Sequence, residues 1–336
     1  MNSILKNSKI SILLLAICFS FTACDEDDDF MTSDDVMETP DPTDDVVESN
    51  TIADFVVANE NYSSLLAALE ATGLTSTFTG DDVYTVFAPD NDAFAAFLDE
   101  NGFDALEDVP TDVLTQVLLN HVQMGEIMSS DLSTGYIESM STAGPDGENL
   151  SMYINTENGV VINGVSTVET ADVEVDNGVI HAVSNVIRLP NVVTFALADP
   201  TFDTLVAALT REDSYTFVST LQASDSPAPF TVFAPTNSAF GDLLSELELE
   251  ELGDLDADTL ATVLSYHVLI DMNVTSDELE DGIIITSLQG EDFTINLGDT
   301  ATITDANGRT STIIATDVQA TNGVIHAIDT VILPTL

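Results

Sequence analysis

The spacing of apolar residues changes along the chain from a helical period to strict alternation, and this change occurs twice. One face of a helix is predicted within residues 112–121, where apolar residues recur at positions i, i+3, i+4 and i+7. From Tyr136 onward, short alternating runs are separated by Asn-Gly pairs, which favour tight turns between strands. The second half repeats this order, with a helical face ending at His267 and alternation from Phe293. Helices therefore precede most strands in each half, which is typical of an α+β protein rather than a parallel βαβ fold.

Each half also contains a strand that is apolar on both faces, followed by a corner and a helix. The two sequences are YTVFAPDNDAF at Tyr84–Phe94 and FTVFAPTNSAF at Phe230–Phe240, 146 residues apart. Such a strand is expected to be covered on both sides of its sheet. Proline ends each strand because it has no N–H to donate. Asp90 or Thr236 then supplies a side chain that can cap the following helix.

Two further landmarks recur in the same order at nearly the same separation. His121 returns as His267, and NGVIHAV at Asn177–Val183 returns as NGVIHAI at Asn322–Ile328. A repeat of this length is large enough to bury its own core, so the chain is predicted to contain two tandem domains. Only a residue or two separates Pro190 from the next predicted helix, so the two domains are expected to touch. The predicted boundaries are 1–23 for a signal peptide, 24–50 for an acidic tether, and 51–190 and 191–336 for the two domains.

These three ordered motifs resemble the signatures of the fasciclin-like domain family, and the resemblance covers roughly residues 50–336. It implies two fasciclin-like domains, each with a helical N-terminal half packed on a β-sheet wedge. It also implies an extracellular module for adhesion or matrix interaction, because that is what the family does. Some eukaryotic members engage integrins through a Tyr-His segment. Tyr266 and His267 match that segment in the second repeat, whereas the first repeat has Asn120 before His121. We interpret Tyr266 and His267 first as core residues and only secondarily as a partner contact.

The charge of the chain is strongly acidic, with 59 Asp and Glu against five Lys and Arg and a net charge of −54. Direct binding of nucleic acid requires clustered basic residues, so it is excluded. Adsorption to an anionic lipid surface is disfavoured for the same reason. The acidity is interpreted either as a solvated surface or, alternatively, as a surface that binds divalent cations.

The first 23 residues have a short basic start and an apolar centre, as in a secretory signal that is too short to span a membrane. This segment ends in FTAC and resembles a bacterial lipobox, which implies a lipid anchor at Cys24. An ordinary cleaved signal with an incidental cysteine is the alternative. The only other cysteine is Cys18, inside the signal, so the mature domains are predicted to contain neither a disulfide nor a thiolate nucleophile.

An acidic run, Asp25–Asp29, follows the cysteine directly and resembles the surface-export signal of Bacteroidetes lipoproteins. The predicted location is therefore the outer membrane, with the domains exposed at the cell surface; an anchor that faces the periplasm is the alternative. The rest of the tether up to residue 50 is acidic and contains proline, so it is predicted to be extended.

Candidate chemistry is limited to four histidines at repeat-equivalent places: His121, His181, His267 and His326. Their spacing contains no His-x-x-x-His or His-x-His pair, so a metal pair is not indicated. No GxSxG elbow and no calcium loop is present. We therefore interpret the histidines as buried imidazoles that bridge backbone groups, and we predict a protein that is not an enzyme and needs no cofactor.

Three functions remain compatible with these sequence features. The first is a lipid-anchored surface protein whose domains adhere to other cells, matrix protein or polysaccharide. The second is an envelope lipoprotein that binds a soluble ligand or a divalent cation. The third is a hydrolase with a carboxylate site that the motifs do not reveal. The family resemblance favours the first.

Overall fold

The computed structural model describes residues 50–335. The predicted signal peptide, the lipidation site at Cys24 and the acidic segment up to residue 49 lie outside these residues. Within residues 50–335, no single helix is long and apolar enough to cross a membrane. One pair of helices, Val192–Ala198 and Pro200–Leu209, has sufficient combined length and apolar composition, but it is bent by 94°.

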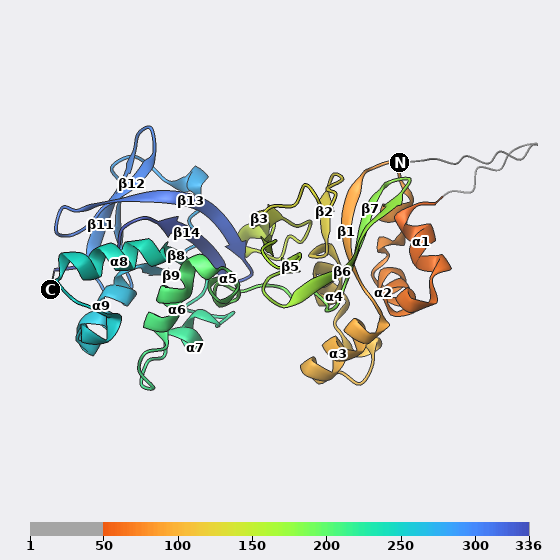
Figure 1. Cartoon of the computed structure of the whole chain (residues 1–336), viewed down its shortest axis with the longest axis horizontal. Helices are drawn as coiled ribbons and strands as arrows, with labels where there is room; N and C mark the ends of the chain where they lie inside the picture. The colour runs from red at the N-terminus through yellow and green to blue at the C-terminus, as the bar shows by residue number, and fades with distance from the viewer. Residues whose placement is uncertain (1–49, 336) are drawn as a thin grey trace, which may run out of the picture. The chain divides into compact units, whose positions relative to one another are not determined.

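The first domain combines four α-helices with a seven-stranded sheet, drawn from orange to yellow-green in Figure 1. The strand order is β2-β1-β7-β6-β5-β4-β3. The helices are α1 (Ile52–Ala58), α2 (Ser63–Thr72), α3 (Asn91–Asn101) and α4 (Thr111–Leu119). The strands are β1 (Tyr84–Pro89), β2 (Val122–Met124), β3 (Gly135–Glu138), β4 (Ser151–Asn155), β5 (Val161–Ile162), β6 (Ser166–Val175) and β7 (Gly178–Val183).

The second domain repeats this arrangement with one additional short helix, α7, and is drawn from green to blue in Figure 1. Its strand order, β10-β11-β12-β13-β14-β8-β9, is the same path through the equivalent strands. The helices are α5 (Val192–Ala198), α6 (Asp203–Leu209), α7 (Phe217–Leu221), α8 (Asn237–Glu246) and α9 (Ala257–Tyr266). The strands are β8 (Phe230–Pro235), β9 (Val268–Ile270), β10 (Ile284–Thr286), β11 (Asp292–Leu297), β12 (Ala301–Thr304), β13 (Thr310–Ala320) and β14 (Gly323–Ile328).

The repeated strand lies inside each sheet, as its apolar faces predict. β1 pairs in parallel with β7 and antiparallel with β2, and all six of its residues are buried. Successive side chains point to opposite faces, so the strand serves two cores. Val86 and Ala88 contact the helical core, whereas Phe87 contacts a separate core on the strand side. The predicted fold class, α+β with helices packed on a sheet wedge, is therefore confirmed.

The helix ends follow from the local sequence. The Asp90 carboxylate accepts a hydrogen bond of 2.8 Å from the Ala93 N–H and caps α3. Thr236 caps α8 in the same way, through the Ala239 N–H at 3.3 Å. Gly73 ends α2 with φ of 72°, a left-handed conformation in which glycine avoids the strain of a Cβ atom.

The two domains contact each other within one compact unit, Glu48–Leu336. The Tyr136 hydroxyl donates a hydrogen bond of 2.9 Å to the Asp199 carboxylate, and the Tyr136 ring packs edge-on against Phe195 at 5.6 Å. The Gln319 N–H donates to the Ser151 hydroxyl at 3.0 Å. The expectation that the domains touch is confirmed.

Candidate functional site

The histidines at the ends of α4 and α9 connect backbone groups inside the core. His121 Nε2 accepts a hydrogen bond of 2.8 Å from the Ile187 N–H, so its Nδ1 carries the proton and donates to the Val117 carbonyl at 2.7 Å. Burial lowers the pKa of His121 to about 4, and the hydrogen bond to Val117 offsets this only in part. His267 has the same environment, and burial likewise lowers its pKa to about 4.

The histidines in β7 and β14 make a second, equivalent pair of connections. His181 Nδ1 accepts from the Asp172 N–H at 3.2 Å, and Nε2 donates to the Ile127 carbonyl at 2.9 Å. His326 makes the same bonds with Asp317 and Val274. All four imidazoles are therefore buried and joined to backbone groups, which confirms the structural interpretation of these residues.

A serine and an aspartate lie beside each strand histidine, but their connectivity is not that of a catalytic triad. The Ser129 hydroxyl donates to the Asp172 carboxylate at 2.5 Å, and Ser276 donates to Asp317. A nucleophilic serine must instead donate to the imidazole, which removes its proton. Here the serine bond lowers the pKa of the Asp172 carboxyl group and holds the loop that precedes β3 against the bend in β6. The arrangement therefore stabilises the wedge.

The Tyr-His segment of the second domain lies in the core. Tyr266 is 0 % exposed, and its hydroxyl donates to the Asp292 carbonyl at 2.7 Å and accepts from the Ala306 N–H at 3.1 Å. Burial raises the pKa of its phenol to about 12. His267 is 3 % exposed. Neither side chain presents surface to a partner, so the structure places both as core residues and offers no contact site there.

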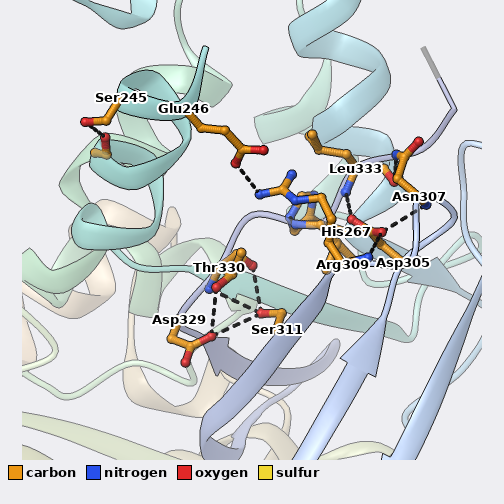
Figure 2. Close-up of polar contacts among 12 residues, drawn as sticks. Ser245, Glu246, His267, Asp305, Asn307, Arg309, Ser311, Asp329, Thr330 and Leu333 are labelled. Atoms are coloured by element: carbon orange, nitrogen blue, oxygen red, sulfur yellow. Dashed lines mark hydrogen bonds and ion pairs between the residues drawn. The ribbon is translucent and has the colours of Figure 1, made fainter. Parts of the chain in front are cut away.

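Asp305 organises the turn between β12 and β13, as Figure 2 shows. Its carboxylate accepts hydrogen bonds from the Asn307 and Arg309 N–H groups and from the Leu333 N–H. The Arg309 guanidinium then reaches Glu246 on α8 at 2.9 Å. This network ties the segment that follows β14 to the hairpin between β12 and β13.

The basic residues of the described region are all occupied by ion pairs. Arg188 pairs with Glu100, Arg211 with Glu212, and Arg309 with Glu246. Within residues 50–335 no group of three or more His, Cys, Asp or Glu side chains is placed to hold a metal ion. The described surface therefore provides neither a free cationic patch nor an assembled ligand set.

Two asparagines have a role that their sequence context does not reveal, since the Asn-Gly pairs indicate only turns. The Asn177 side chain accepts from the Ile52 N–H at 2.8 Å and donates to the carbonyls of Phe78 and Gly80. Asn322 joins Val192, Leu221 and Ala223 in the same way. Each asparagine therefore ties the first helix of its domain, and the segment before the central strand, to the hairpin.

A surface rich in uncharged polar residues covers the outer face of β10–β13 in the second sheet, and we call it the threonine face. Register places Thr294 opposite Thr304 and Thr304 opposite Thr310, and it places Asn296 opposite Thr302. Exposed isoleucines flank these rows, with Ile284 66 % and Ile314 54 % exposed. The threonine face is defined by Ile284, Thr294, Asn296, Thr302, Thr304, Thr310, Thr312 and Ile314, with Asp292 at its border.

The equivalent face of the first domain is different because aromatic residues occupy it and the second domain covers it. Tyr136 pairs with Tyr153 across β3 and β4, where the second domain has Ile284 and Thr294. Tyr153 is 3 % exposed and belongs to the helical core cluster of the second domain. One sheet face thus joins the domains, while the other remains accessible.

Together, the repeated wedge and its buried polar bridges define a tandem α+β module. The fasciclin domain profile matches residues 60–190 and 200–334. The chain belongs to the fasciclin domain family.

Several known proteins are similar to parts of the chain. Protein sll1483 of Synechocystis sp. is 35 % identical over 140 residues, which cover 42 % of this chain and 74 % of that protein. Human periostin is 27 % identical over 283 residues, covering 81 % of this chain and 30 % of periostin. A solved FAS1 domain pair from the insect cell adhesion molecule fasciclin I is 19 % identical with a TM-score of 0.46, covering 84 % of this chain and 95 % of that chain. Fasciclin domains occur in cell-adhesion and matrix-interacting proteins.

Proposed function

We propose that this protein is a non-enzymatic adhesion protein, anchored by lipid at Cys24 to the outer membrane and exposed at the cell surface. The second domain binds neutral polysaccharide through the threonine face. Family membership supports the adhesion role, and the lipobox-like sequence before Cys24 supports the anchor.

The observation that carries the proposed ligand is that the threonine face has a single carboxylate, Asp292 at its border, in a protein with 59 acidic residues. Hydroxyl and amide groups project from adjacent strands, which lie about 4.8 Å apart, so a flat chain of hydroxyl groups can meet several of them at once. Ile284 and Ile314 provide apolar surface for the C–H faces of sugar rings.

A glycan array probed with the purified protein tests this proposal. Thr302→Glu places a carboxylate in the middle of the threonine face, opposite Thr312. Thr111→Glu adds the same charge to an exposed position at the start of α4 in the first domain and serves as the control. We expect the wild-type protein and Thr111→Glu to bind the same neutral glycans and Thr302→Glu to lose at least tenfold in affinity. Equal binding by all three proteins would contradict binding at the threonine face.

A further inference from the structure

The helical half of the second domain contains an apolar cavity of about 90 Å³. It lies between α5, α6 and α7 and the inner face of β8, and Thr210 is the one polar residue among the fourteen that line it. In the first domain, the overlapping space between α1, α2 and β1, which also extends toward His121, has a volume of about 20 Å³. The helical core is therefore nearly filled in the first domain, whereas it contains a cavity in the second.

The difference follows from side chains at equivalent positions. Val192 begins α5 where Ile52 begins α1, directly after the N-cap, and it lacks one methylene group. Ala196 stands four residues later, at the position of Val56, and lacks both methyl groups. The opposite exchange, Val193 for Ala53, occurs beside them without closing the cavity.

The third and largest reduction in side-chain volume is at Leu221, and hydrogen bonds show which residue of the first domain it corresponds to. The Phe78 carbonyl accepts from Asn177, and the Leu221 carbonyl accepts from the equivalent Asn322. Leu221 thus occupies the place of Phe78, and it has a smaller side chain. The Phe78 ring lines the space in the first domain and packs edge-on against Tyr84 at 5.4 Å, whereas Leu221 leaves the corresponding volume empty.

The cavity reaches the surface on the side of α5 and α6. Leu197 is 65 % exposed and Thr210 is also exposed, although both line the cavity. Val206 and Val218 are half-buried between them and the interior. A ligand can therefore enter with one end while its remainder stays outside.

We propose that this cavity binds the end of an uncharged linear alkyl chain, such as the acyl tail of a neutral lipid or a long-chain alcohol. An apolar lining of this kind stays dry and favours an apolar occupant. The volume is below the roughly 150 Å³ of a cavity known to hold benzene and far below the roughly 300 Å³ of the smallest typical ligand pockets, so it suits a few methylene groups rather than a whole ring system. The strongly acidic surface disfavours a chain that ends in a carboxylate.

The test is a titration of the full protein with 1-hexanol, followed by NMR of methyl-labelled Ile, Leu and Val residues. We expect saturable shifts for Val192, Leu205 and Val218, and no shifts for the first-domain residues Ile52 and Leu65. Cyclohexanol, which has the same number of carbon atoms in a ring, should bind at least tenfold more weakly. Equal shifts in both domains, no saturable shift, or equal binding of cyclohexanol would overturn the proposal.

Two filling variants copy the first domain. Leu221→Phe restores the aromatic side chain, and Ala196→Val restores two methyl groups, so each should lower the affinity for 1-hexanol at least tenfold. Phe78→Leu is the matched reverse change, and it should create binding in the first domain. If a filling variant fails to fold, Val192→Ile provides the same test with one methylene group. Unchanged affinity in a folded filling variant contradicts the cavity as the binding site.

Discussion

Leu221 in the second domain occupies the position that Phe78 occupies in the first, because each presents its carbonyl to the hairpin asparagine of its own domain. The same backbone framework therefore supports a filled core in one copy and a cavity in the other. Since the two copies lie in one chain, each serves as the control for the other, and conditions that affect stability act on both.

The first prediction concerns this pair of residues and stability. Leu221→Phe should raise the free energy of unfolding of the second domain by about 0.5–2 kcal/mol, because it fills an existing cavity. Phe78→Leu should lower that of the first domain by about 1–3 kcal/mol, because it removes buried contacts and leaves space. Urea unfolding followed by NMR of methyl groups in each domain measures the two effects separately. A loss of stability in Leu221→Phe would show that the cavity cannot accept an aromatic ring.

The second prediction concerns the asparagine that holds three backbone groups in the first domain. Asn177→Ala should destabilise by about 2–4 kcal/mol, because it leaves the buried Ile52 N–H and the buried Phe78 carbonyl without partners and removes the partly buried bond to the Gly80 carbonyl. Asn177→Asp keeps the acceptor for Ile52 but places a carboxylate beside the Phe78 and Gly80 carbonyls, so it should not restore stability. Thermal unfolding of both variants checks this. Stability in Asn177→Ala equal to that of the wild type would contradict the assigned role.

The third prediction concerns the glycine that follows this asparagine. Gly178 has φ of 139°, and a Cβ atom there would lie 1.9 Å from the Tyr84 carbonyl oxygen. Gly178→Ala should therefore prevent the close approach of β7 to β1 and destabilise the domain by more than about 3 kcal/mol. Gly147→Ala is the control, because its φ is also positive while its Cβ would meet nothing within 4 Å. Equal melting temperatures for the two variants would contradict the steric explanation.

The fourth prediction concerns pH. His121 and His267 have folded-state pKa values of about 4, below the ordinary value of 6.5. The unfolded chain therefore binds protons that the folded protein does not bind between pH 6.5 and 4, so the stability contributed by the neutral imidazoles is complete above pH 6.5 and is lost as pH falls to about 4. Each histidine should account for roughly 3 kcal/mol of that loss.

The control for this effect is His267→Gln, which should be less stable than the wild type at pH 7 but should lose less stability on acidification. Urea unfolding at several pH values between about 7 and 4 gives, for each protein, the slope of the unfolding free energy against pH. Identical slopes for the wild type and the variant would show that this histidine does not carry the pH dependence.

The sequence predicted the elements whose causes are local. The cap at Asp90 and the strand that begins at Tyr84 each depend on a few adjacent residues, and both are confirmed. The burial of the histidines could also be predicted, because His121 and His267 end apolar helix faces.

Other features could not be predicted because they depend on tertiary contacts. The Asn177 side chain connects groups 99 and 125 residues away, so the dipeptide Asn-Gly indicated only a turn. The threonine face requires the register of β10–β13, and the cavity depends on how side chains from separate helices fill a shared volume.

The fifth prediction concerns the anchor. If Cys24 carries the lipid, Cys24→Ser should move the protein from the membrane fraction to the soluble fraction, because acyl chains supply about 0.8 kcal/mol of membrane affinity per buried methylene group. Immunoblotting of fractionated cells measures the distribution, and Cys18→Ser is the matched control within the predicted signal. Membrane association that survives in Cys24→Ser would contradict lipid anchoring at this residue.

Protease treatment of intact cells is the most direct test of a surface adhesion role. We predict that added protease degrades residues 50–335 of the protein on unbroken cells, while a periplasmic marker in the same cells stays intact. If the protein survives on intact cells and is degraded only after lysis, the domains face inward, and adhesion to an external partner is contradicted.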